Sequence, residues 1–365
     1  MKVGDLARAM EAIAPLAFAE EWDNVGLLAG DPGAPLRRAL LCIDCTREVV
    51  AEAAREECEA IVAYHPPLFR PVSRVTAGSV IFDVVRRGLA VYSPHTALDA
   101  AAGGTNDVLA DAIGMEAERA PIRGAAAKDI EHKLVTFVPA ASVAGVSEAL
   151  FEAGAGRIGE YHSCSFRSHG TGTFFGGEGT KPVVGRAGQL ETAEEVRLET
   201  VVPIGKVEAV VRALRAAHPY EEPAFDLVRL ARAPAKGAPG MGRIGAIAPA
   251  DRASLLARIK ERLGVANLLV AGPKAGRVTR AAVCAGAAGD LLDAAIRQGA
   301  EVIVAGEIRH HDALRAAAAG VTVVCALHSN SERITLEPLR ARLAAALPDA
   351  RFVLSTVDRD PFVIE

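Results

Sequence analysis

The chain has 365 residues, of which 50% are hydrophobic, 24% charged and only 4% aromatic. That length and apolar content allow two or three domains with buried cores, which excludes an intrinsically disordered protein. With 41 basic and 45 acidic residues the net charge is −4, so no overall attraction to nucleic acid or anionic lipid is expected.

The amino-terminal segment lacks the pattern of a signal peptide, because Asp5 and Glu11 interrupt its apolar residues. No window reaches the roughly 20 apolar residues that a membrane span needs. The six cysteines are scattered and do not resemble a disulfide framework. Cys42 and Cys45 form a CxxC pair inside an apolar run, and without a second pair this pattern favours core packing over a zinc site. We therefore expect a cytoplasmic protein with no membrane association.

Helical and strand patterns alternate over residues 1–128 and again over residues 243–365. This alternation is typical of a mixed sheet covered by helices, so the two ends of the chain are expected to form one α/β core. The expected helices are 4–15, 47–58, 79–88, 106–113, 254–264, 290–299 and 310–320, and the expected strands are 38–45, 60–65, 89–95, 277–286, 301–307 and 321–328.

Residues 129–232 have a different pattern. Two strand and helix pairs, at 133–154 and 197–218, flank a loop-rich stretch of Gly, Ser, Thr and His at 168–182. Two such units in about 100 residues predict an inserted ferredoxin-like α+β domain. The Ala, Pro and Gly residues at 231–242 are typical of a linker.

Histidine is the commonest neutral metal ligand and the usual acid–base group near pH 7. Of the nine histidines, five fall in three clusters outside the insert. Each cluster follows a predicted strand, and open α/β sheets place their sites at the carboxyl ends of strands. These five are His65, His95, His310, His311 and His328.

Carboxylates accompany these histidines. His328 and Glu332 are four residues apart, which places them on one face if a helix begins at Ser329 or Asn330; His95 and Asp99 have the same spacing. A mixed nitrogen and oxygen set suits zinc, iron, manganese or cobalt better than calcium. A carboxylate that bridges two ions would suit a dinuclear hydrolytic site, in which metal-bound water is the nucleophile.

Several motifs, in this order, resemble the NGG-interacting-factor-like dinuclear metal proteins, the GTP cyclohydrolase 1 type 2 homologs. The resemblance spans nearly the whole chain and implies a toroidal homohexamer, a trimer of dimers with metal sites facing its cavity. It also implies an inserted domain similar to CutA and PII proteins, which ends in a motif like HPYEEPAFD at 218–226. The other motifs are EEWDNVGLLAGDP, AYHPPLF, YSPHTALDAAAGGTNDVLA, GEIRHHDAL and ALHSNSER.

The resemblance implies which residues bind two divalent ions: Tyr64, His65, Asp99, His328 and Glu332 by motif position. Tyr64 is a departure, because that family usually has histidine there and a phenol with a pKa near 10 is a weaker ligand at neutral pH. One or two ions of zinc, iron or manganese are therefore expected per chain. The residue before His328 is a second departure, a leucine in place of the usual glycine.

Other residues near these motifs have two interpretations each. Trp22, Asp23 and Asn24 either line the site or pack structurally. Asp44 either neutralises a ligand or caps the helix that follows it. Gly103 and Gly104 favour a turn over a phosphate loop, because no GxxxxGK[ST] pattern is present.

The remaining polar residues are less informative. Glu307, His310 and His311 either orient ligands and move protons or are exposed at a helix start. His162 and His169 of the insert are expected to be structural or to contact another subunit. His218, Tyr220, Glu221 and Glu222 form a polar cluster without an assigned role.

Two functions fit these patterns. The first is a metal-dependent hydrolase for a small molecule such as a nucleotide or phosphoester, with GTP cyclohydrolase-like ring opening as one candidate and with His95 or His310 moving protons. The second is a non-enzymatic, hexameric metal-binding scaffold or regulator that binds a partner or effector through its cavity or insert. The phenol at Tyr64 favours the second, because a weakened ligand is easier to tolerate without catalysis.

Overall fold

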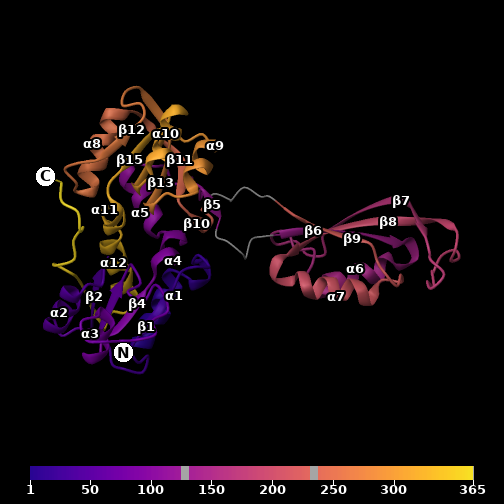
Figure 1. Ribbon diagram of the computed structural model, residues 1–365, viewed down its shortest axis with the longest axis horizontal. Helices are drawn as coiled ribbons and strands as arrows, with labels where there is room; N and C mark the ends of the chain where they lie inside the picture. Colours follow the sequence, from indigo (N-terminus) through magenta and orange to yellow (C-terminus); the bar gives the residue numbers. More distant parts are fainter. Residues whose placement is uncertain (125–130, 231–236, 365) are drawn as a thin grey trace. The chain divides into compact units, whose positions relative to one another are not determined.

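The computed structural model describes residues 1–124, 131–230 and 237–364 (Figure 1). The chain divides into two compact units. The first combines Met1–Ala125 with Pro234–Glu365, and the second is Ala126–Ala233. The first unit is thus made from both ends of the chain. Of the expected linker at 231–242, residues 231–236 lie outside the described residues.

The first sheet of the larger unit has the strand order β1-β4-β3-β2-β16. Strand β1 is antiparallel to β4, and the other neighbours are parallel. Helices α1 and α12 cover one face and α2 and α3 the other, because alternate strand residues point to opposite faces. The strands are Gly26–Ala29 (β1), Arg38–Cys42 (β2), Ala60–Ala63 (β3), Ala90–Ser93 (β4) and Arg351–Leu354 (β16), and the helices are Val3–Ile13 (α1), Arg47–Arg55 (α2), Val80–Arg86 (α3) and Leu336–Ala346 (α12).

The second sheet has the order β11-β13-β14-β15-β12, with parallel central strands and antiparallel edges. Helices α5 and α8 pack on one face and α9 and α10 on the other. The strands are Arg243–Asp251 (β11), Leu269–Ala271 (β12), Arg277–Ala287 (β13), Val302–Glu307 (β14) and Thr322–Cys325 (β15), and the helices are Thr105–Ile113 (α5), Arg252–Leu263 (α8), Leu291–Arg297 (α9) and His310–Ala318 (α10).

The predicted α/β class is confirmed, with two mixed sheets. Each half of the larger unit contains an element from the other end of the chain. Strand β16 pairs with β2 in the first sheet, and helix α5 packs against β13 of the second. Cys42 and Cys45 are buried free thiols, as core packing predicts. The helix expected from Ser329 is instead two short helices, His328–Arg333 (α11) and Leu336–Ala346 (α12). None of the described helices is long and apolar enough to cross a membrane.

The inserted unit has the chain order β6-α6-β7-β8-α7-β9 and the sheet order β7-β8-β6-β9. This is the ferredoxin-like topology that the sequence predicts. The loop expected around residue 168 was wrong, because this segment, including His169, forms strand β7. The side chains of β7 are mostly exposed, so its sequence shows no apolar alternation. The elements are Glu131–Pro139 (β6), Val143–Glu152 (α6), Ser165–Phe175 (β7), Leu190–Pro203 (β8), Val207–Ala217 (α7) and Phe225–Arg229 (β9).

Candidate metal centre

Three of the predicted ligands converge in the larger unit. His65 follows β3, His328 begins α11, and Glu332 lies one turn later on α11. One ligand atom from each lies within 4.8 Å of the others. The Glu332 carboxylate lies between the two imidazoles, with Oε2 3.2 Å from His65 Nε2 and Oε1 3.3 Å from His328 Nε2. Two motifs that lie 263 positions apart in the sequence, at His65 and at His328, therefore form one cluster.

Two atoms of this cluster are buried without a hydrogen-bond partner among the described residues. They are His65 Nε2 and Glu332 Oε2, whose 3.2 Å approach lacks hydrogen-bond geometry. A buried polar atom left unpaired costs about 1–3 kcal/mol. Both atoms are chemically suited to a divalent transition ion, and coordination would satisfy them. The residues present therefore fit one ion.

A carboxylate orients each imidazole. His65 Nδ1 donates to Asp44 Oδ1 at 2.9 Å, and His328 Nδ1 lies 3.1 Å from Glu307 Oε1. With Nδ1 engaged, each ring presents Nε2 to the cluster, as metal-binding histidines commonly do. Asp44 is thus a ligand-orienting residue, while Thr46 caps α2 by accepting from the Val49 amide.

The charges in this cluster are strongly coupled. Burial opposes protonation of His65, but Asp44 and Glu332 outweigh it and raise the pKa of His65 to about 10. The bond with Glu332 raises the pKa of His328 to about 9 despite burial. Burial alone would raise the pKa of Glu332, but the two histidines hold it below its usual value. Binding of a cation releases protons from the imidazoles, so metal affinity rises with pH through the neutral range.

A close-packed backbone surrounds the cluster. Gly286 has φ +63°, and a Cβ there would lie 2.7 Å from Glu332 Oε1 and 3.2 Å from His328 Nε2. Its amide donates to Ser331 Oγ at 2.8 Å. Leu327 has φ +70° and ψ 154°, a conformation that costs a non-glycine residue on the order of 1–3 kcal/mol. The leucine at this departure from the family motif is thus a strained residue next to a ligand.

We expect Gly286→Ala to weaken metal binding at least tenfold, because the added methyl group displaces Glu332 and His328. The matched control is Gly289→Ala, where φ is +47° and no atom lies within 4 Å of the added Cβ. Both substitutions impose left-handed strain of about 1–2 kcal/mol, but only the first reaches the ligands. Zinc titration of the two variants distinguishes these effects, and equal affinities would contradict the prediction.

Asp44→Ala is expected to lower metal affinity by about 10- to 100-fold, the usual effect of losing an orienting carboxylate. Glu307→Ala serves as the comparison, because the Glu307 side chain is 61% exposed against 39% for Asp44, so its loss should cost less. Competition with a chromogenic chelator measures both constants. A larger loss for Glu307→Ala would reverse the assigned order.

Tyr64 and Asp99 do not join the three ligands. Tyr64 is buried, and its hydroxyl donates to Asp99 Oδ1 and lies 3.0 Å from Thr105 Oγ1. Burial and the charge of Asp99 raise the pKa of the phenol well above its usual value. Burial and Glu332 raise the pKa of Asp99 to about 6. The protonated phenol donates its hydrogen bond to Asp99 and offers no anionic oxygen of its own. This pair of side chains therefore does not fit a site for a second metal ion.

His95, a candidate for proton transfer, lies beside the metal cluster. Its ring centroid lies 5.4 Å from that of His65, and its Nδ1 donates to Asp23 Oδ1 at 2.7 Å. Asp23 also accepts from the Thr96 amide and hydroxyl. Burial would raise the pKa of Asp23, but the bonds from His95 and Thr96 keep it below its usual value. Asp23 therefore belongs to the site, as one of its two interpretations predicts.

Two other residues singled out from the sequence, Trp22 and His310, are exposed. Trp22 is 59% exposed and contacts the rings of Phe69 and His95, so it is not a core anchor. His310 is exposed and its ring contacts His311. Among the described residues, no hydrogen bond, ion pair or ring contact joins His310 to the metal cluster. Its acid–base role remains a prediction.

Sequence reasoning did not identify two residues that support the site. Asn106 accepts from the Ala285 amide at 2.9 Å and donates to the Asp99 carbonyl at 3.0 Å. Ser331 accepts from Gly286 and donates to the His328 carbonyl at 2.7 Å. Both are buried polar residues inside the motifs, but only the folded structure shows which backbone groups they satisfy.

Comparisons with known proteins agree on one family. The family model Duf34/NIF3 (NGG1p interacting factor 3) matches residues 1–361. The chain is 37% identical to the GTP cyclohydrolase 1 type 2 homolog of Halalkalibacterium halodurans, with 96% of each chain covered. It is 35% identical to the protein of that name from Bacillus subtilis, with 96% of this chain and 95% of the relative covered.

Solved structures give the same result. A Bacillus cereus protein related to NIF3 superposes with a TM-score of 0.68 at 32% identity, covering 100% of this chain and 99% of the other. A Staphylococcus aureus protein superposes with a TM-score of 0.69 at 27% identity and the same coverage. The protein belongs to the DUF34/NIF3 family.

Proposed function

We propose that this protein is a metal-dependent hydrolase that binds one divalent ion of zinc, iron or manganese and acts on a nucleotide or phosphoester. The observation that carries the proposal is the convergence of His65, His328 and Glu332, two of whose buried ligand atoms have no hydrogen-bond partner among the described residues. The relatives' name, GTP cyclohydrolase 1 type 2 homolog, supports the same class of chemistry.

When bound, a divalent ion polarises a substrate oxygen and lowers the pKa of water, which is the chemistry that a hydrolase needs. His65, His328 and Glu332 would hold it. Asp44 and Glu307 keep the two imidazoles in the orientation that presents Nε2. Because Glu332 is only 2% exposed, its negative charge is weakly screened and favours a cation at this point.

His95 is the residue that we expect to move a proton. Asp23 accepts a hydrogen bond from His95 Nδ1. This bond keeps the proton on Nδ1 and leaves Nε2 free to accept a proton from water and return it to a leaving group. The exposed side chains of Trp22 and Phe69 contact the His95 ring and would exclude water from one side of it. Asp23 acts through His95 and is a positioning residue.

The decisive test is turnover by reconstituted protein of known metal content. Protein loaded separately with zinc, iron(II) and manganese is assayed with GTP and with p-nitrophenyl esters of phosphate. We expect hydrolysis that falls at least 100-fold in His95→Gln while metal content is unchanged, because this variant removes only the proton carrier. Absence of turnover in all three fully loaded forms would contradict the proposal.

A non-enzymatic scaffold or regulator is the second candidate, and the Tyr64–Asp99 hydrogen bond favours it. The family motif implies a histidine and an aspartate as metal ligands at these two positions. Here a neutral phenol takes the place of the histidine and donates a hydrogen bond to the aspartate. Effector-induced thermal shifts that persist after loss of the metal would support this function over the first.

We also propose a homohexamer, as the family resemblance implies. Light scattering of the purified protein should give six times the 38.0 kDa chain mass. A monomeric or dimeric mass at micromolar concentration would contradict it.

A further inference from the structure

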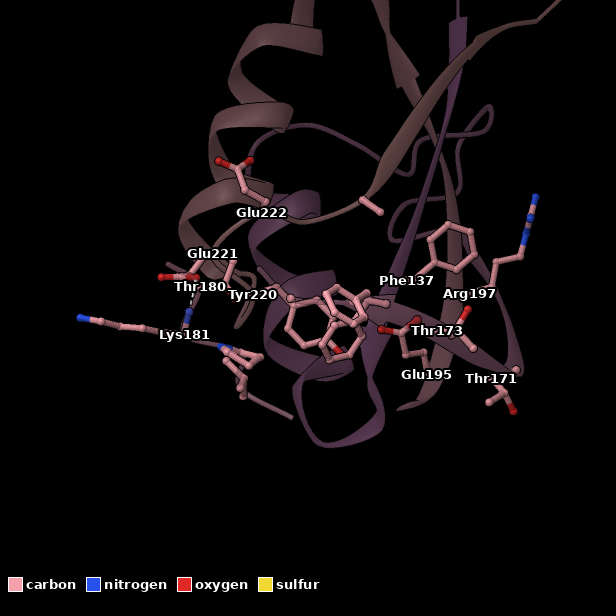
Figure 2. Close-up of a pocket in the computed structure, with 18 of the residues that line it drawn as sticks. Phe137, Thr171, Thr173, Thr180, Lys181, Glu195, Arg197, Tyr220, Glu221 and Glu222 are labelled. Carbon is pink, nitrogen blue, oxygen red and sulfur yellow. Dashed lines mark hydrogen bonds between the residues drawn. The ribbon is translucent and has the colours of Figure 1, made fainter. Parts of the chain in front are cut away.

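The inserted unit contains a cavity of about 600 Å³ (Figure 2). The β7–β8 hairpin, β6 and the segment 220–224 line it. Its size lies within the range of small-molecule sites. Aromatic side chains from three elements line it: Phe137 of β6, Phe174 and Phe175 of β7, and Tyr220. Such rings bind flat ligands by stacking and edge-to-face contact.

His218 fixes the position of Tyr220. This histidine is 6% exposed; its Nδ1 accepts from the Tyr220 amide at 3.1 Å and its Nε2 donates to the Phe137 carbonyl at 3.0 Å. Burial lowers the pKa of His218, and its two hydrogen bonds require one specific neutral tautomer. The HPYEEP motif therefore holds the Tyr220 ring at the cavity wall.

Two further bonds secure that wall. The Thr136 hydroxyl donates to the Ala224 carbonyl at 2.9 Å, and Glu221 Oε2 accepts from the Lys181 amide of the hairpin at 3.0 Å. The wall is thus attached to both β6 and the hairpin. Two members of the polar cluster His218, Tyr220, Glu221 and Glu222 thus have a structural role: His218 and Glu221 hold the cavity wall in place.

Polar side chains also line the cavity, among them His169, Thr173 and Glu195. The Glu195 carboxylate points toward the aromatic rings (Figure 2). The Tyr220 hydroxyl is buried beside Glu195, and burial together with its interaction with that carboxylate raises the pKa of Tyr220 to about 12. Arg197, the basic residue nearest along β8, pairs with Glu199 at 2.8 Å. A carboxylate offers about four lone-pair sites, so Glu195 can accept hydrogen bonds from a ligand as well as from Tyr220.

We propose that this cavity binds a planar aminoheterocycle, whose ring packs against Phe137, Phe174 and Tyr220 and whose amine and adjacent ring N–H donate together to Glu195. A carboxylate accepts two parallel N–H bonds from such an edge, and the pairing is stronger when the ligand is cationic. Cationic rings also gain attraction from aromatic faces. An anionic ligand in the same position would meet the Glu195 carboxylate and is disfavoured there.

The test uses the full-length protein and two probes of almost equal shape. 2-Aminobenzimidazole presents the paired donors, whereas 2-methylbenzimidazole replaces the amine with a methyl group. Affinities come from ligand-observed NMR titration. We expect 2-aminobenzimidazole to bind at least tenfold more tightly than the methyl analogue, and Glu195→Gln to remove at least tenfold of its affinity.

Glu194→Gln is the matched control. Glu194 is the preceding residue on β8, pairs with Thr171 at 3.2 Å and is not part of the cavity lining, so its loss should leave affinity unchanged. Phe174→Leu tests the ring contact independently and should weaken binding of both probes. No binding of 2-aminobenzimidazole at millimolar concentration, equal binding of the two probes, or retained affinity in Glu195→Gln would overturn the proposal.

Discussion

Glu332→Gln is expected to lower metal affinity more than 100-fold and to abolish any metal-dependent turnover. The amide keeps the size of the side chain but removes the negative charge between His65 and His328. That charge is buried and weakly screened, so its loss removes most of the attraction for a divalent cation. Isothermal titration with zinc and elemental analysis after dialysis measure the effect.

Glu337→Gln is the matched control for this substitution. Glu337 lies one turn beyond α11, and its exposed carboxylate pairs with Arg340, a surface contact of small energetic value. Its substitution should change neither metal content nor turnover. A Glu332→Gln protein that still holds one ion per chain would show that the described cluster is not the metal centre.

The alternation of helices and strands was predictable because buried parallel strands have continuous apolar sequences, as at Ala60–Ala63 and Val302–Val304. The division into two sheets was not. It depends on the pairing of Arg351–Leu354 with Arg38–Cys42, more than 300 residues apart, and long-range pairing leaves no local pattern. Strand β7 was missed for a different reason, since its exposed side chains lack apolar alternation.

The site was predictable to the level of residue clusters at strand ends. The spacing of His328 and Glu332 and the resemblance named His328 as a ligand, but the sequence left open whether His310 supports the site. The fold shows that Glu307 and Glu332 contact His328, whereas His310 is exposed. The role of Asp23 likewise required the structure, since it bonds His95 from 72 residues away.

Tyr64→His is expected to raise metal content from one ion per chain to two. In the present chain the phenol donates to Asp99 and keeps that carboxylate occupied. An imidazole in its place presents a neutral nitrogen ligand and releases Asp99. Burial and Glu332 raise the pKa of Asp99 to about 6, and a second cation beside both carboxylates would favour their ionised forms.

Tyr64→Phe separates the two parts of this explanation, because it frees Asp99 without supplying a ligand. We expect both Tyr64→Phe and the unmodified chain to bind one ion and Tyr64→His to bind two. Elemental analysis and zinc titration give the stoichiometry, and circular dichroism confirms that each variant is folded. Two ions in the unmodified chain would show that the phenol does not block the second position, and one ion in Tyr64→His would show that residue 64 does not determine metal number.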